Sequence, residues 1–92
     1  MATYKRTFSS GSKQTSAGGD IITITDTDGS PANIQFLHFQ TFSSPCSIKL
    51  NNESTIHWID ANSEFIISDI YIGKITVIDA GVQYYFTALA ID

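Results

Sequence analysis

The segment around the single tryptophan gathers side chains of the kind that bind sugars. The stretch "HWIDANSE" places His57, Trp58, Asp60 and Glu64 close together. An aromatic ring can stack on the apolar face of a sugar, and carboxylates accept hydrogen bonds from its hydroxyl groups. Paired carboxylates also perform glycoside hydrolysis, but a small β domain offers little room for a catalytic groove. The segment predicts either a glycan contact through these four residues or a core tryptophan, because Trp58 alternates with Ile56.

Metal chemistry finds weaker support in the sequence. The residues His38, Cys46 and His57 show none of the close spacings that zinc ligands adopt. The stretch "DTDGS" (residues 26–30) starts like a calcium loop, but the rest of the pattern is missing, and Asp with Gly also makes turns. No Ser-His-Asp or Cys-His pattern and no phosphate-binding glycine loop is present. We therefore expect no metal, no other cofactor and no enzymatic activity.

The lone cysteine and the apolar pattern bound the class of protein. One cysteine makes no internal disulfide, so we interpret Cys46 as a small buried apolar residue in a chain suited to a reducing compartment. Residues 1–19 hold no apolar run typical of a signal peptide, and no stretch approaches the ~18 apolar residues of a membrane span. The sequence therefore predicts no membrane association.

The charge is divided unevenly along the chain. Residues 1–19 carry three basic and no acidic side chains, whereas residues 20–92 carry nine acidic and two basic ones. Three positive charges are few for nucleic-acid binding, and the acidic body repels phosphate, so no nucleic-acid partner is expected. The Ser/Gly-rich segment is then either a tail without a role or a flexible arm that lies on a neighbouring subunit. The residues expected to contact that neighbour are Tyr4, Lys5, Arg6, Phe8 and Lys13.

From Asp20 onward the hydrophobic period is two, which is typical of β-strands. Short apolar runs alternate with turn signals about every ten residues, and no helix is indicated. This pattern predicts an all-β fold: an antiparallel β-sandwich, jelly-roll-like or Ig-like, of seven or eight strands over residues 20–92, with residues 1–19 as a flexible basic arm. Both faces of the strand expected at residues 32–42 are partly apolar, so this strand should be central or lie at an interface.

A body of this size buries little apolar surface and has neither disulfide nor metal to support it. Oligomerisation is the remaining common source of stability. Charged residues make up only 15% of the chain, which leaves a largely neutral surface suited to packed assemblies. We therefore expect a homo-oligomer, and removal of the arm should weaken assembly while leaving the body folded.

The stretch "IKLNNESTIHWIDANSEFIISDIYIGKITVIDAGVQYYF" (residues 48–86) resembles a module of small virion proteins of tailed bacteriophages, of the head-decoration and head-fibre type. It combines a strand ending in Asn, a loop of small residues and an acid before Phe65, and a final aromatic strand. The resemblance implies an oligomeric β-sandwich, for example a trimer, with arms that reach neighbouring subunits.

The leading hypothesis is therefore a non-enzymatic structural protein of a bacteriophage particle, assembled in the host cytoplasm. It would bind copies of itself and other virion proteins on a capsid or tail surface. The alternative is a carbohydrate- or receptor-binding β module that uses Trp58 and its polar neighbours.

Overall fold

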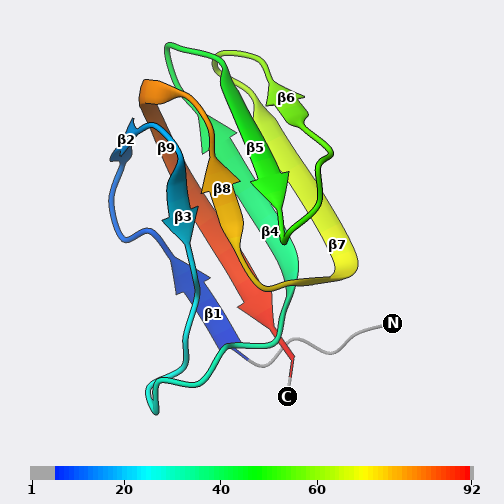
Figure 1. The fold of residues 1–92 in the computed structure, drawn as a ribbon. Coiled ribbons are helices and arrows are strands. Elements are labelled where there is room, and N and C mark those ends of the chain that lie inside the picture. Colours follow the sequence, from blue (N-terminus) through cyan, green and yellow to red (C-terminus); the bar gives the residue numbers. More distant parts are fainter. Residues whose placement is uncertain (1–5, 92) are drawn as a thin grey trace.

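The computed structural model describes residues 6–91 and shows two antiparallel β-sheets packed face to face (Figure 1). Sheet A has the strand order β1-β9-β4-β7, and β2 also pairs with β9. Sheet B has the order β3-β8-β5-β6. The strands are β1 (Arg6–Ser9), β2 (Gln14–Ala17), β3 (Asp20–Ile22), β4 (Ile34–Thr41), β5 (Cys46–Leu50), β6 (His57–Ile59), β7 (Glu64–Ile72), β8 (Ile75–Val77) and β9 (Ala80–Ala90).

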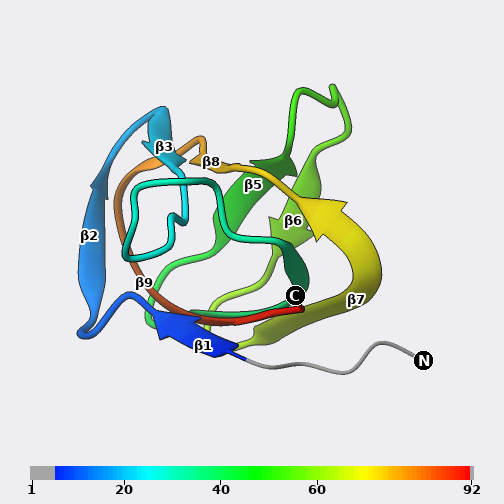
Figure 2. The ribbon, with the colours of Figure 1, turned by 90° about the horizontal axis from the view of Figure 1, so that it is seen from below.

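The predicted all-β sandwich is confirmed. Figure 2 shows the two sheets as opposite layers, with β2 at one side and the curved β7 at the other. The seven strands from β3 to β9 match the seven or eight strands expected of residues 20–92. The strand β7 is continuous from Glu64 to Ile72, although Asp69 interrupts its extended backbone with a φ of 63°.

The core lies between the sheets and follows the alternation of β9 and β4. On β9 the buried positions recur at every second residue, from Val82 to Ala90. On β4 the fully buried Phe39 stacks on Tyr84, with ring centroids 5.2 Å apart. β4 lies between β7 and β9, so its predicted central place is confirmed.

Asparagine forms the turn that follows β5. Asn51 has a φ of 58°, a left-handed conformation that Asn tolerates better than most residues. Its side chain also fixes the distant β7–β8 turn, because its Nδ2 donates to the Tyr71 carbonyl at 2.9 Å and its Oδ1 accepts from the Gly73 N–H at 2.6 Å. One asparagine thus joins two turns at the same end of the sandwich.

The structure corrects the expectation of a flexible arm over residues 6–17. β1 and β2 both pair antiparallel with β9, with Arg6 opposite Ala90 and Gln14 opposite Tyr84. β9 pairs with β4 along one edge, and the main-chain groups along its other edge also need hydrogen-bond partners. β1 and β2 supply these partners through their backbone, whatever side chains they carry. Phe8 adds a side-chain contact with the hydrophobic core. Tyr4 and Lys5 lie outside the described residues.

Candidate functional site

The outer face of sheet B carries three large apolar side chains in solvent. Ile21, Ile56 and Trp58 are 63%, 58% and 62% exposed. Trp58 pairs with Ser47 on β5, and Ile56 directly precedes β6. Lys49 pairs with Thr76, which in turn pairs with Ile21. We call the set Ile21, Lys49, Ile56 and Trp58 the sheet B face.

The interpretation of Trp58 as a core residue is wrong. β6 is a three-residue edge strand, and only Ile59 of its side chains is buried. Trp58 points to the opposite side, where no further layer formed by residues 6–91 covers the sheet. Its Nε1 donates to Asp60 Oδ1 at 2.9 Å, so one polar atom of the indole is held while the ring stays accessible.

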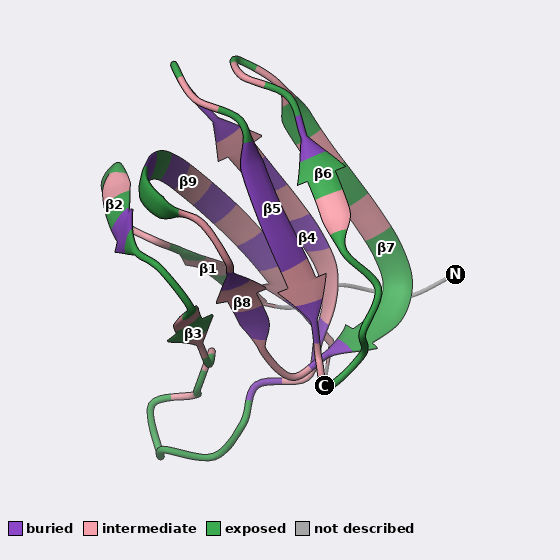
Figure 3. Ribbon diagram, turned by 45° about the horizontal axis from the view of Figure 1, so that its top comes forward, coloured by how far each residue is buried: buried purple, intermediate pink, exposed green. Residues whose placement is uncertain are grey.

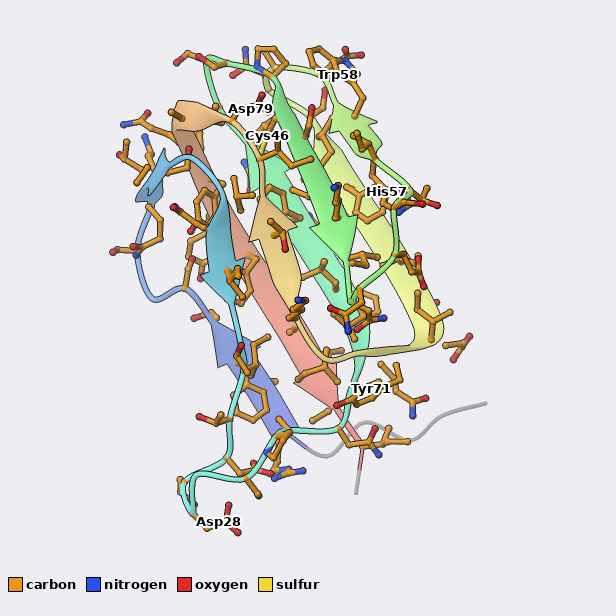
Figure 4. All side chains as sticks on the ribbon, viewed as in Figure 1. Asp28, Cys46, His57, Trp58, Tyr71 and Asp79 are labelled. Carbon is orange, nitrogen blue, oxygen red and sulfur yellow. The ribbon has the colours of Figure 1, made fainter. Side chains whose placement is uncertain are left out.

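The structure divides the four residues of the predicted glycan contact. Trp58 and Asp60 lie together, but His57 alternates to the other side of β6 and packs against Phe65, with ring centroids 5.1 Å apart (Figure 4). Glu64 lies on sheet A, where its Oε1 is 3.5 Å from Nε2 of His38. This contact between Glu64 and His38 is not a hydrogen bond, and the buried Nε2 of His38 has no hydrogen-bond partner among the described residues. The four side chains therefore do not converge on one ligand position.

The described residues of the predicted arm contact their own chain. Arg6 forms an ion pair with Asp26, and its Nη2 lies 3.4 Å from the Ile91 carbonyl oxygen. The Lys13 ammonium lies 4.3 Å from the centre of the Phe42 ring, a cation–π contact. Contact of Arg6, Phe8 and Lys13 with a neighbouring subunit stays a prediction.

Cys46 is buried, as the sequence predicts. Burial raises the pKa of its thiol to about 11, and the nearby carboxylate of Asp79 acts in the same direction. Asp79 also accepts a hydrogen bond from the Ser47 N–H at 2.7 Å. At neutral pH the Cys46 sulfur is thus a protonated, inaccessible thiol.

The "DTDGS" residues make a turn. Asp28 accepts hydrogen bonds from the Ser30 hydroxyl at 2.6 Å and from the Ser30 N–H at 3.0 Å, which lower the pKa of its carboxyl group. The Gly29 N–H donates to the Asp26 carbonyl at 2.9 Å, while the Asp26 carboxylate is paired with Arg6. Within residues 6–91, no group of three metal-ligating side chains occurs.

Sequence reasoning missed the apolar surface of β7. Ile66 is 58% exposed, and Ile70 and Tyr71 are also in solvent (Figure 3). Ile66 and Ile67 point to opposite faces of sheet A, so the apolar character of β7 is not confined to the core side. The signal was present in the run "FIISDIYI", which is apolar on both faces, as "IQFLHF" is on β4.

Comparison with protein-family models, curated proteins and solved structures finds no match to this chain. The resemblance of residues 48–86 to phage virion proteins therefore stays a prediction. Over the described part of the chain, the structure contains no helix of a length and apolarity that would cross a membrane.

Proposed function

We propose that the chain is a non-catalytic structural component of a bacteriophage particle, which self-associates and binds to the surface of other particle proteins. The observation that carries the proposal is the sheet B face, where three large apolar side chains lie exposed on the sheet that also carries Lys49, in a chain of formal net charge −4. Large apolar side chains exposed on one face of a sheet are a feature of interaction sites on soluble proteins. A decoration protein of the head or a related head or tail component would use such a face to attach.

Magnitudes favour attachment at many repeated sites over a single strong contact. Burying a large apolar side chain contributes roughly 1.5–3 kcal/mol. Losing free motion on association costs on the order of 4–15 kcal/mol. Ile21, Ile56 and Trp58 are already about 40% buried, so together they contribute roughly 3–5 kcal/mol, near the lower end of this cost. A particle surface that presents the same site many times compensates, because linked copies bind with a high effective concentration.

The test is the number of copies in purified particles of the phage that carries the gene. We expect the wild-type chain in fixed stoichiometry with the capsid or tail proteins. The Ile56→Ser/Trp58→Ser variant should be present in at least about tenfold fewer copies, since it removes the exposed apolar groups of β6. Thr7→Ser, an exposed change on β1, serves as the matched control and should keep the wild-type number.

Two results would overturn the proposal. One is a chain absent from purified particles. The other is equal incorporation of Ile56→Ser/Trp58→Ser and wild type, once circular dichroism shows both to be folded. The neighbouring genes give an independent check, because a structural role predicts capsid, portal or tail genes beside this one.

The exposed indole favours glycan binding as a second candidate function. Trp58 presents its ring to solvent while Asp60 holds its N–H, an arrangement that can stack on a sugar and accept a bond from a hydroxyl. A glycan array screened with the wild-type chain and with Trp58→Ala tests it. Binding that disappears in Trp58→Ala supports this function, and an array without signal rejects it.

A further inference from the structure

One edge of the sandwich differs from the others. The edge strands β1, β2, β3 and β6 have three or four residues each, whereas β7 has nine. Short edge strands are a usual protection against pairing with another chain. β7 pairs only with β4 among the described residues, and its outward Ile66 is exposed. β7 is thus the long edge strand that lacks this protection.

The hydrogen-bond pattern shows which main-chain groups of β7 point outward. Within the β4–β7 register, the Thr41 N–H donates to the Ser63 carbonyl at 2.9 Å. In an antiparallel ladder such bonded pairs alternate along the strand. Residues 65 and 67 therefore also direct their N–H and C=O groups at β4. Glu64, Ile66 and Ser68 direct theirs at the uncovered edge.

We propose that two copies of this chain associate by antiparallel pairing of β7 with β7, about a two-fold axis at Ile66. This register places Ile66 opposite Ile66 of the second copy and Glu64 opposite Ser68. The outward main-chain groups of all three residues then bond across the interface. On the inner face the same register places Phe65 opposite Ile67, an aromatic pair with a β-branched partner. Sheet A would continue through both copies.

Charge and backbone geometry favour a second copy as the occupant in this register. Glu64 is the one charged residue of the segment 64–68, and it meets Ser68 rather than another acid. The paired segment ends before Asp69, whose φ of 63° breaks the extended backbone. An isologous contact needs one self-complementary patch, and this segment is self-complementary in both hydrogen bonds and side chains.

This inference deepens the self-association that the proposed function includes, and it does not involve the sheet B face. A ladder of five residues per copy is about 17 Å long, and it buries less than the ~800 Å² per partner of a standard interface. We therefore expect a dissociation constant on the order of micromolar.

The first test is sedimentation equilibrium of the full chain from about 1 to 200 µM, a range that brackets the expected micromolar constant. Ile66→Lys places two lysines opposite each other at the axis and should weaken the dimer at least about tenfold. Thr7→Lys is the matched control, because Thr7 is exposed on β1, another edge strand of sheet A, and belongs to neither β7 nor the sheet B face. It should dimerise as the wild type does. A wild-type monomer throughout the range, or equal dimerisation of Ile66→Lys and wild type, overturns the inference.

The second test locates the contact by crosslinking. Directly opposite residues of a bonded pair have Cα atoms about 5.5 Å apart, a distance that a disulfide spans. Ile66→Cys should therefore give a disulfide dimer under mild oxidation, whereas Thr7→Cys, exposed on β1, should stay monomeric under the same conditions. The native Cys46 is buried and does not compete. Absence of a crosslinked dimer for Ile66→Cys, or equal crosslinking of Thr7→Cys, overturns the inference.

The two proposals fail in different experiments. If β7 pairing is wrong, Ile66→Lys has the same association state in solution as the wild type, while the Ile56→Ser/Trp58→Ser variant is still present in fewer copies per particle. If the particle role is wrong, the chain is missing from particles, while Ile66→Cys still crosslinks.

Discussion

At the scale of single residues, the two faces of β4 contribute differently to the stability of the fold. Phe39 is fully buried and stacks on Tyr84, whereas Phe36 is half-buried on the outer face of the same strand. Phe39→Ala should lower the free energy of unfolding by about 3–5 kcal/mol, because it loses both transfer energy and packing. A domain of this size has a total stability of roughly 5–14 kcal/mol.

The matched variant Phe36→Ala should cost about 1 kcal/mol, since its ring leaves a partly solvated position. Urea unfolding followed by circular dichroism measures both changes. Equal costs for the two phenylalanines would contradict the assignment of Phe39 to the core and of Phe36 to the outer face.

Cys46 gives a prediction for the pH dependence of stability. Burial raises the pKa of its thiol from 9.0 to about 11 in the folded chain, so the folded state holds the proton more tightly than the unfolded state does. This contribution to stability is complete below pH 9 and is lost as the pH rises toward 11. Burial raises the pKa of Tyr84 as well, which acts with the same sign. Stability should therefore fall across this window.

The variant Cys46→Ala measures how much the thiol contributes to this fall in stability with pH. We expect its free energy of unfolding to fall less between pH 8.5 and pH 10.5 than that of the wild type, in urea titrations at each pH. Tyr84 is present in both chains, and burial, the main cause of its raised pKa, is common to them. The Cys46 thiolate also raises the pKa of Tyr84, so this smaller contribution is removed together with the thiol. Parallel pH profiles would show that the thiol does not contribute.

At the scale of elements, β1 and β2 support β9. Ser16 is buried on β2, and its hydroxyl donates to the Asp79 carbonyl at 2.6 Å and accepts from the Val82 N–H at 3.0 Å. Deletion of residues 1–19 removes these bonds and exposes one edge of an eleven-residue strand. We expect the remaining chain to lose several kcal/mol of stability and to aggregate through that edge, contrary to the expectation from sequence.

Ser16→Ala is the smaller test of the same contact, and it should cost about 1–3 kcal/mol because it leaves the Val82 N–H buried without a partner. Thermal unfolding and light scattering measure both changes. A truncated chain that unfolds at the wild-type temperature and stays monodisperse would contradict this role of β1 and β2.

The elements also show what alternation can and cannot predict. The apolar period of two identified the strands from β3 to β9, because each has a face that packs in the core. "RTFS" and "QTSA" carry almost no such pattern, and their strand geometry comes from main-chain bonds to β9. Alternation also does not say which strand lies at an edge. Alternation therefore leaves open whether Trp58 lies in the core, and it does not reveal the exposed face of β7.

At the scale of the whole molecule, two models of association predict opposite effects of salt. The chain has a formal net charge of −4, so two copies repel each other when they pair through the nearly neutral segment 64–68. Screening reduces this repulsion, since the Debye length falls from about 30 Å at 0.01 M to about 8 Å at 0.15 M. Pairing through β7 should therefore tighten a few-fold as sodium chloride rises from about 20 to 300 mM. A basic arm on an acidic neighbour would instead bind more weakly with added salt.

Sedimentation equilibrium at the two salt concentrations distinguishes the two models of association, and Arg6→Gln/Lys13→Gln supplies the control. Under β7 pairing, this variant has a more negative charge and should dimerise less tightly at low salt while keeping the same sign of the salt effect. A dimer that weakens with salt, and whose salt dependence this variant abolishes, would assign association to the arm.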